Sequence, residues 1–280
     1  MFELNYAPPS EDLAEYISAF YLFETDEPIM NDIERADLPQ FRFTITGDGS
    51  ILFKNDKDQK IERVSLYGPR NTWSRVVANG PILMFGFGLL PAGWAALTGA
   101  NAHEYANKIT AAHLLAGPEI DLLACALEDV VTLEEMVNLA NTYMRGVISK
   151  APSPPLWFIR AVDKWLESSL LPDIEALSKK TGLSRRQIDI QIKHYYGATP
   201  KLLIRKYRAL RTANHLAHGD GELHEYIAEA YYDQSHCIKE LKEFTGITPS
   251  GLKTTLTRLT SLTFKRRRLA GTVANLTANT

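Results

Sequence analysis

The sequence predicts an α+β protein with a small antiparallel β-barrel or sandwich at its N-terminus and an all-α C-terminal half. Three observations predict this class. Short runs rich in β-branched and aromatic residues fill the first third of the chain. Helical periodicity replaces them after Pro91. Beyond residue 155, a short helix, a turn and a second helix that ends at a glycine occur twice.

Six segments of the first third have the composition of strands. Gly47-Asp48-Gly49 is typical of a tight turn between two of them, and Gly68-Pro69 and Gly80-Pro81 separate others. The predicted strands are Tyr16–Glu24, Phe41–Thr46, Ile51–Lys54, Ile61–Leu66, Arg75–Val77 and Ile82–Phe87.

An amphipathic helix is predicted from Leu133 to Ile148. Its apolar residues recur at intervals of three and four, Thr132 is suited to the N-cap, and Glu135 stands three residues later. The apolar stripe has two interpretations that the sequence does not separate. It packs on the barrel as a cover helix, or it forms the seam of a homodimer.

The segment Ser149–Pro155 predicts a boundary between domains, because its three prolines cannot continue a helix. We therefore expect an N-terminal domain over residues 1–150, a linker over 151–155 and a helical domain over 156–262. Residues 263–280, with Lys265-Arg266-Arg267-Arg268, are expected to form a basic, flexible tail.

Charge is divided unevenly along the chain. Residues 1–155 hold 11 basic and 21 acidic residues, whereas residues 156–280 hold 20 and 12. A basic C-terminal half favours contact with phosphate backbones. No run of about 18 apolar residues predicts a membrane span, and the first ten residues do not resemble a secretion signal, so a cytoplasmic location is expected.

The first helix-turn-helix unit begins at Asp173, which is suited to cap a helix running to Thr181. Gly182 provides the positive φ of the turn, and Ser184 caps a second helix from Arg185 to Tyr195. A linker helix is predicted from Lys201 to His218.

The second unit repeats this arrangement from Tyr226 onward. Its second helix follows Asp233 and ends at Gly246, 13 residues later, and Gly197 likewise stands 13 residues after Ser184. The two stops, Gly-Ala-Thr-Pro and Gly-Ile-Thr-Pro, therefore lie at matching offsets, which indicates an internal duplication.

Residues Ile159 to Lys253 resemble the AraC/XylS family of bacterial transcription regulators. The most specific part is Tyr-Tyr-Asp-Gln-Ser-His from Tyr231, followed by Thr-Gly-Ile-Thr-Pro from Thr245. The resemblance implies two helix-turn-helix units joined by a linker helix. It also implies a cupin-like N-terminal barrel with cover helices that binds an effector, mediates dimerisation or both. The expected partners are double-stranded promoter DNA, RNA polymerase, a small-molecule or nucleotide effector and a second copy of the chain, with activation as the expected mode.

The family motif assigns DNA-reading roles by position. In the first unit, the arginine suits a guanine edge, the aspartate a cytosine amine and the isoleucine a thymine methyl group. These base-facing residues are Arg186, Asp189 and Ile190. The matching residues of the second unit are Gln234, Ser235, Ile238 and Lys239. Residues expected to contact phosphates are Arg185, Lys193, Lys201, Arg205 and Lys242.

The second unit departs from the family pattern in three places. Ala230 replaces the turn glycine, Cys237 replaces an aromatic residue, and Glu243 is acidic where a basic residue is common. These departures support an alternative, in which the basic half acts through protein contacts without reading DNA. Salt-dependent, sequence-selective binding to one promoter separates the two hypotheses.

The segment Arg70-Asn71-Thr72-Trp73-Ser74-Arg75 is the candidate effector site. Two arginines that flank a tryptophan suit an anionic nucleotide, since guanidinium groups bind phosphate and stack on bases. The segment is similar to the paired-arginine motif of PilZ-type cyclic-di-GMP receptors, with four residues between the arginines instead of three. The candidate ligand-binding residues are Arg70, Asn71, Thr72, Trp73 and Arg75. The alternatives are arginines that neutralise local acids beside a packed Trp73, another effector such as a sugar, fatty acid or aromatic compound, or no small ligand.

We expect no enzymatic activity, no catalytic cofactor and no metal site. The sequence has no serine elbow, phosphate loop or His-Glu motif. Cys125 and Cys237 are 112 positions apart, lack metal-ligand spacing, and are expected to be buried thiols.

Overall fold

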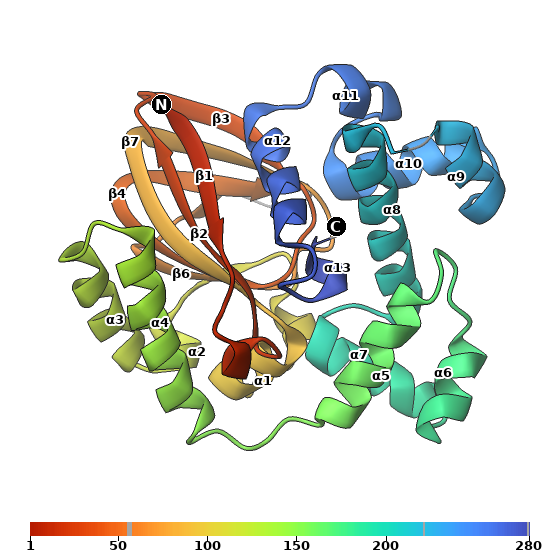
Figure 1. The fold of residues 1–280 in the computed structure, drawn as a ribbon, viewed down its shortest axis with the longest axis horizontal. Coiled ribbons are helices and arrows are strands. Elements are labelled where there is room, and N and C mark those ends of the chain that lie inside the picture. Colours follow the sequence, from red (N-terminus) through yellow and green to blue (C-terminus); the bar gives the residue numbers. More distant parts are fainter. Residues whose placement is uncertain (55–57, 221, 279) are drawn as a thin grey trace.

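The computed structural model describes residues 1–54, 58–220, 222–278 and 280. Its N-terminal domain is an antiparallel sheet that curls into a half-barrel (Figure 1). The hydrogen-bonded order is β1-β2-β7-β4-β6-β8, with β3 paired to β7 and β5 to β4. The strands are β1 (Phe2–Ala7), β2 (Ile17–Thr25), β3 (Ile29–Glu34), β4 (Gln40–Phe53), β5 (Gln59–Lys60), β6 (Val64–Tyr67), β7 (Ser74–Leu89) and β8 (Ile109–Ala111).

Two predicted turns lie inside long strands. Gly47-Asp48-Gly49 is part of β4, where the pairing with β7 shifts register on both sides of Thr46, and Gly80-Pro81 is part of β7. Gly47 has a φ of +86°, which glycine adopts without strain. Bulges of this kind bend a strand without ending it. The four predicted strands around these glycines are therefore two long, bent strands that cross the whole half-barrel.

The face of the sheet that packs against the helices of this domain is aromatic. Phe20, Phe41, Phe43, Phe85 and Phe87 are all at most 2% exposed. Their ring centroids lie 5.4 to 6.5 Å apart in stacked, tilted and edge-to-face pairs. This spacing is typical of favourable aromatic pairs, so the five rings form the centre of the core between the sheet and the helices.

Helices cover the aromatic face of the half-barrel. They are α1 (Pro91–Thr98), α2 (His113–Ala116), α3 (Glu119–Glu128) and α4 (Leu133–Ile148), with 3-10 turns at Glu11–Leu13 and Ala102–Tyr105. The capping box of α4 is formed by Thr132 and Glu135, as predicted. Met136, Ala140 and Met144 of α4 are buried in the same core as the barrel phenylalanines. The apolar stripe of α4 therefore packs on the barrel.

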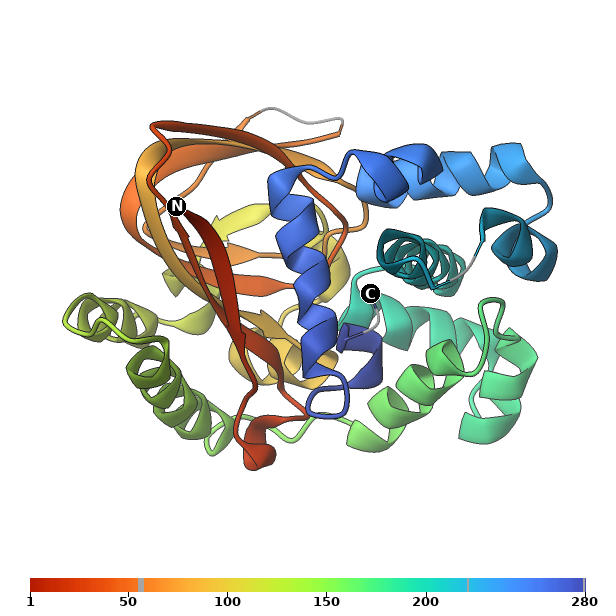
Figure 2. The ribbon, with the colours of Figure 1, turned by 45° about the horizontal axis from the view of Figure 1, so that its top comes forward.

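The C-terminal domain consists of helices. They are α5 (Leu156–Glu167), α6 (Ile174–Thr181), α7 (Arg185–Tyr196), α8 (Pro200–His218), α9 (Leu223–Ala230), α10 (Gln234–Thr245) and α11 (Pro249–Thr254). One core lies among α5, α6 and α7, and another lies among α8, α9 and α10. The helix α8 contributes residues to both cores, so it joins two compact units (Figure 2).

The predicted flexible tail is folded. Helix α12 (Arg258–Phe264), the 3-10 turn η3 (Lys265–Leu269) and α13 (Asn275–Ala278) return to the N-terminal domain, where α12 lies beside β1 and β3 (Figure 1). Leu259 and Leu262 are buried with barrel residues, and Arg266 is 4% exposed. The expectation of a solvated basic tail was wrong because Arg266 pairs with the buried Asp37.

Two other features bear on the expectations. None of the described helices is long and apolar enough to cross a membrane. Cys237 is buried, as expected, but Cys125 is exposed because it lies on the outer side of α3.

Candidate nucleic-acid interface

The first helix-turn-helix unit is formed by α6 and α7. Asp173 caps α6 by accepting from the Glu175 backbone N–H, and Ser184 caps α7 in a capping box with Gln187. Gly182, between the two helices, has a φ of +71°. These caps and this turn were predicted. They hold α7 so that one side is buried and its N-terminal half is open to solvent.

The predicted base-facing residues of α7 lie on that open side. Arg186 is exposed, and Ile190 is 54% exposed. Asp189 is half-buried, and its Oδ2 lies 2.7 Å from the Lys193 Nζ one turn later. Arg185 pairs with Glu175 of α6. Among the residues that the structure describes, the Arg186 guanidinium and the Ile190 side chain thus face solvent without a competing ion pair.

The second unit is formed by α9 and α10. Asp233 caps α10 by accepting from the His236 backbone N–H at 2.7 Å. Ala230, predicted at the turn, is instead the last residue of α9, and the turn begins at Tyr231. Tyr231 has an extended backbone, with a φ of −126°, so no glycine is needed there. Cys237 is fully buried in the core of the unit. The departures from the family pattern at Ala230 and Cys237 are therefore accommodated within the fold.

The expected base-reading side of α10 is also open. Gln234, Ser235 and Lys239 are exposed, and Ile238 is half-buried. Lys242, expected at a phosphate, is exposed as well. The N-terminal ends of α7 and α10 therefore both present side chains to solvent.

Arg205, predicted to contact a phosphate, instead forms an ion pair within the C-terminal domain. The Arg205 Nε of α8 donates to Glu240 Oε1 at 2.7 Å, and Arg208 donates to the other oxygen of the same carboxylate. Glu240 is 1% exposed, so it needs these partners. Arg205 thus joins α8 to α10, whereas Lys201 on the same helix is exposed. The sequence did not predict the roles of Arg208 and Glu240.

Comparison with protein families agrees with this geometry. A helix-turn-helix domain family matches residues 177–255, which span both units and α8. Residues 177–255 of this chain are therefore an AraC-type helix-turn-helix domain. A second match, to a domain of unknown function (DUF6597), covers residues 5–111 of the half-barrel domain. No curated protein matches the chain.

Several solved structures are similar to the chain at low identity. A structure of ToxT from Vibrio cholerae is 11% identical, covers 85% of this chain and 98% of its own, and has a TM-score of 0.49. ToxT with a bound unsaturated fatty acid is 12% identical over 86% and 95%, with a TM-score of 0.45. The AraC-like transcriptional activator CuxR is 15% identical over 75% and 81%, with a TM-score of 0.35.

The predicted effector segment lies between the two domains. Arg70 is 2% exposed and pairs with Glu34 of β3. Asn71 and Thr72 are buried and donate hydrogen bonds to the C-terminal domain. Trp73 is half-buried, and Arg75 is exposed on β7. The structure does not gather these five residues around a common pocket, because three of them are buried in the domain interface.

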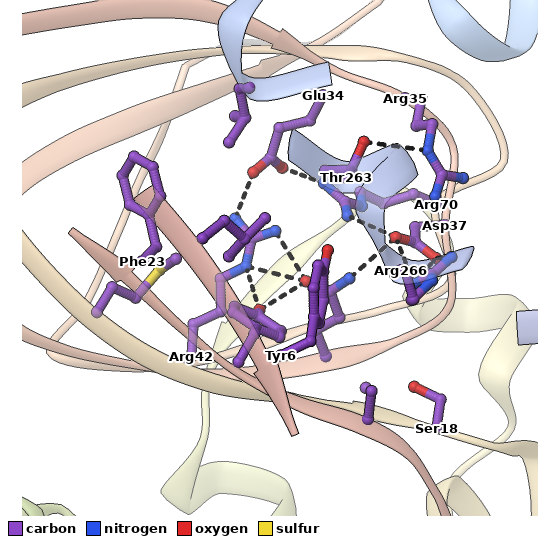
Figure 3. Close-up of a pocket in the computed structure, with 17 residues that line it drawn as sticks. Tyr6, Ser18, Phe23, Glu34, Arg35, Asp37, Arg42, Arg70, Thr263 and Arg266 are labelled. Atoms are coloured by element: carbon purple, nitrogen blue, oxygen red, sulfur yellow. Dashed lines mark hydrogen bonds and ion pairs between the residues drawn. The ribbon is translucent and has the colours of Figure 1, made fainter. Parts of the chain in front are cut away.

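A cavity lies inside the half-barrel, where α12 closes it (Figure 3). Of the predicted effector segment, only Arg70 lines this cavity. Its polar side has the Arg42 Nη1 2.7 Å from Glu34 Oε1 and the Arg266 Nη1 3.1 Å from Asp37 Oδ1. Leu259 of α12 lines the cavity too. The free space is about 40 Å³, enough for a few water molecules.

Buried charges surround this cavity. Burial opposes ionisation of Asp37, but Arg266, Arg35 and Arg70 hold the pKa of its carboxyl well below the usual range. The Lys206 Nζ of α8 donates to the Asp37 carbonyl oxygen at 2.8 Å. Burial lowers the pKa of Lys206 to about 7, although Asp37 opposes that shift. The cavity itself is lined by more cationic than anionic side chains, namely Arg35, Arg42, Arg70 and Arg266 against Glu34 and Asp37.

Proposed function

We propose that this chain is a sequence-specific DNA-binding transcription regulator in which α7 and α10 read base edges in the major groove. The observation that carries the proposal is the pair of exposed N-terminal helix ends, each held by a capped helix-turn-helix unit. Such units place the N-terminal residues of the second helix against bases.

The two helices have different reading chemistry. On α7, Arg186 suits the O6 and N7 atoms of guanine, and Ile190 suits a thymine methyl group. On α10, Gln234 suits adenine, and Lys239 suits guanine. Lys201 and Lys242 are exposed and suit phosphates, which hold register without reading sequence. Arg205 is left out of this set because of its ion pair with Glu240.

Gel shifts at several salt concentrations test this function. A duplex selected by the full chain from a random-sequence library should bind much more tightly than a scrambled duplex, with an affinity that falls steeply as salt rises. Equal, weak binding to every duplex would instead favour the alternative, in which the basic half regulates a partner through protein contacts.

We infer further that an effector with an anionic group acts on the N-terminal domain. The half-barrel cavity offers Arg35, Arg42, Arg70 and Arg266 beside an apolar wall. Any ligand larger than a few waters requires α12 to move, since the free space is about 40 Å³. A fluorescent carboxylate amphiphile tests this inference; it should bind wild-type protein and lose affinity in Arg42→Ala.

Cyclic di-GMP remains one hypothesis for this effector. Trp73 and Arg75 are accessible to a nucleotide, but Arg70 is buried and paired with Glu34. Calorimetry with cyclic di-GMP decides the matter: heat that disappears in Arg75→Ala supports the nucleotide, and no heat with the wild type excludes it.

The remaining parts of the proposal concern regulation. We propose that the protein is a homodimer that activates transcription by contacting RNA polymerase, as the AraC family resemblance implies. A reporter driven by the selected duplex should lose expression when the chain is deleted, and a rise in expression would instead indicate repression. Sedimentation of the full chain tests the dimer.

A further inference from the structure

Tyr232 stands in the turn between the two helices of the second unit, directly before the cap of α10. Its side chain is 92% exposed, more than any other large apolar or aromatic side chain that the structure describes. The neighbouring Tyr231 is 7% exposed, and its hydroxyl donates to the Thr212 Oγ1 of α8 at 3.2 Å. One tyrosine of this pair therefore fixes the turn to the core, and the other faces solvent with its ring and its hydroxyl.

The backbone of this turn is held by hydrogen bonds at three points. The Arg208 Nη1 of α8 donates to the Ala230 carbonyl oxygen at 3.0 Å. The Tyr232 backbone N–H donates to the His236 Nδ1 at 3.3 Å, and the Asp233 Oδ1 accepts from the His236 backbone N–H at 2.7 Å. A turn that is already ordered loses little further backbone entropy when its exposed side chain contacts a partner, so Tyr232 is preorganised for binding.

His236 connects the turn to a buried ionic centre. Because its Nδ1 accepts a hydrogen bond, the hydrogen of the neutral ring is on Nε2, which lies 3.2 Å from the Glu240 Oε1. The buried Glu240 carboxylate also accepts from Arg205 and Arg208 of α8. The position of the Tyr232 backbone is thus set by the same carboxylate that joins α8 to α10.

The place of this turn predicts what Tyr232 meets when the second unit binds a duplex. In helix-turn-helix proteins the first helix crosses the DNA backbone, and the N-terminal residues of the second helix reach the base edges. The turn between the two helices therefore lies at the edge of the groove, beside the sugar-phosphate strand. A tyrosine hydroxyl is one of the donors that contact phosphate oxygens. The adjacent carboxylate, Asp233, is engaged as the cap of α10.

We propose that the Tyr232 hydroxyl is a phosphate contact of the second unit and that His236 is the residue that positions it. This inference depends on the DNA-binding function proposed above, and it adds a contact at a position to which the family motif assigned none. The contact holds the register of α10 without reading sequence, as Lys242 is expected to do, but it brings no charge to the phosphate.

Tyr232→Phe, which removes the hydroxyl and keeps the ring, is the test variant. Tyr226→Phe, at a half-buried tyrosine of α9 in the same unit, is the matched control. In gel shifts with the full chain, we expect Tyr232→Phe to weaken binding to the selected and the scrambled duplex alike by about 10- to 100-fold, because it removes a hydrogen bond to a charged group. Its salt slope should remain that of wild type, since no cation is lost. Tyr226→Phe should bind as wild type does.

Modified DNA locates the contact. Selected duplexes that carry one methylphosphonate, at successive positions of the half-site read by α10, each lack one charged phosphate oxygen. At one position we expect wild type to lose about the factor that Tyr232→Phe loses on the unmodified duplex. At this position Tyr232→Phe should lose little more, because the two changes remove the same hydrogen bond.

Two substitutions of His236 test its positioning role. The side-chain oxygen of His236→Asn can accept from the Tyr232 N–H in place of the imidazole Nδ1, whereas His236→Leu offers no acceptor. We therefore expect His236→Asn to bind nearly as tightly as wild type and His236→Leu to bind more weakly. His236→Leu should add little to the loss in a Tyr232→Phe background. An equal loss in both backgrounds would show that His236 supports the fold and does not position Tyr232.

Two results would overturn the phosphate contact. One is a Tyr232→Phe variant that unfolds at the wild-type temperature and binds the selected duplex as tightly as wild type; if reporter expression falls nonetheless, Tyr232 contacts a protein instead. The other is a loss in Tyr232→Phe that is additive with the methylphosphonate at every position. Absence of selective binding by wild type contradicts the proposed DNA-binding function as a whole, whereas selective binding that Tyr232→Phe fully retains contradicts this inference alone.

Discussion

Charged residues of the same type have opposite surroundings in this molecule. Arg186 and Lys239 are exposed on the recognition helices, whereas Arg208 and Arg266 are about 4% exposed and pair with buried carboxylates. Sequence patterns identified the first group, because motif positions specify it. They could not identify the second group, because its acidic partners are more than 30 residues away in the chain.

Substitution of Arg186 should separate base reading from phosphate contact. We expect Arg186→Ala to weaken binding to the selected duplex by about 1–3 kcal/mol and to relax the preference at one base pair. Lys242→Ala should weaken binding to all duplexes alike and reduce the salt slope by about 1. Competition gel shifts at several salt concentrations measure both effects. Identical behaviour of the two variants would contradict the assignment.

Asp163 of α5 gives the first unit a pH dependence. Burial raises the pKa of its carboxyl to about 7, although a hydrogen bond from the Tyr196 hydroxyl at 2.8 Å opposes the shift. Between about pH 4 and 7 the folded state therefore binds more protons than the unfolded state, and stability falls as pH rises through this window.

Asp163→Asn should remove this dependence and keep the acceptor for Tyr196. From pH 5 to pH 8, we expect the free energy of unfolding of the variant to rise by about 2–3 kcal/mol relative to that of wild type. Urea titrations of both proteins at the two pH values measure the difference. Parallel pH profiles would show that Asp163 keeps an ordinary pKa.

At the scale of elements, local signals predicted the helices better than the strands. The caps at Asp173 and Ser184, the helix start after Asp233 and the stops at Gly197 and Gly246 were correct, because each depends on a few adjacent residues. The strands β1 and β3 were missed, since their sequences, FELNYA and IMNDIE, mix polar and apolar residues at an exposed part of the sheet.

The C-terminal segment was mistaken for a solvated tail for a related reason. Its run of basic residues is typical of a mobile tail. In the folded protein, Asp37 of the barrel domain pairs with Arg266, and Asp32 accepts a hydrogen bond from the Leu259 backbone N–H. The interface between the domains, including the contacts of Asn71 and Thr72, has no local signal in the sequence either. Such contacts arise from the arrangement of elements and not from any one segment.

Helix α12 should be needed to close the half-barrel. Leu259 is 6% exposed among Leu4, Phe23 and Met30, so Leu259→Ala is expected to lower the free energy of unfolding by about 2–4 kcal/mol. It should also increase the fluorescence of a dye that binds apolar cavities. Ser261→Ala, on the exposed side of the same helix, is the control. Unchanged stability would show that α12 does not contribute to the core.

At the scale of the whole molecule, two helix-turn-helix units share one chain with a barrel that contacts both. The family match covers the two units. The barrel contacts them through Asn71 and Thr72, and Asp37 of the barrel pairs with Arg266 of the C-terminal segment. The fold class and the twin units were predictable from the sequence. The distance between the units was not, because it is set by contacts between domains.

The central claim is that α7 and α10 read neighbouring grooves of one duplex. Hydroxyl-radical footprinting of the full chain on the selected duplex tests it most directly. We predict two protected patches about one helical turn apart on the same face, with one lost in Arg186→Ala and the other in Lys239→Ala. A single patch, or two patches that weaken together in either variant, would contradict the claim.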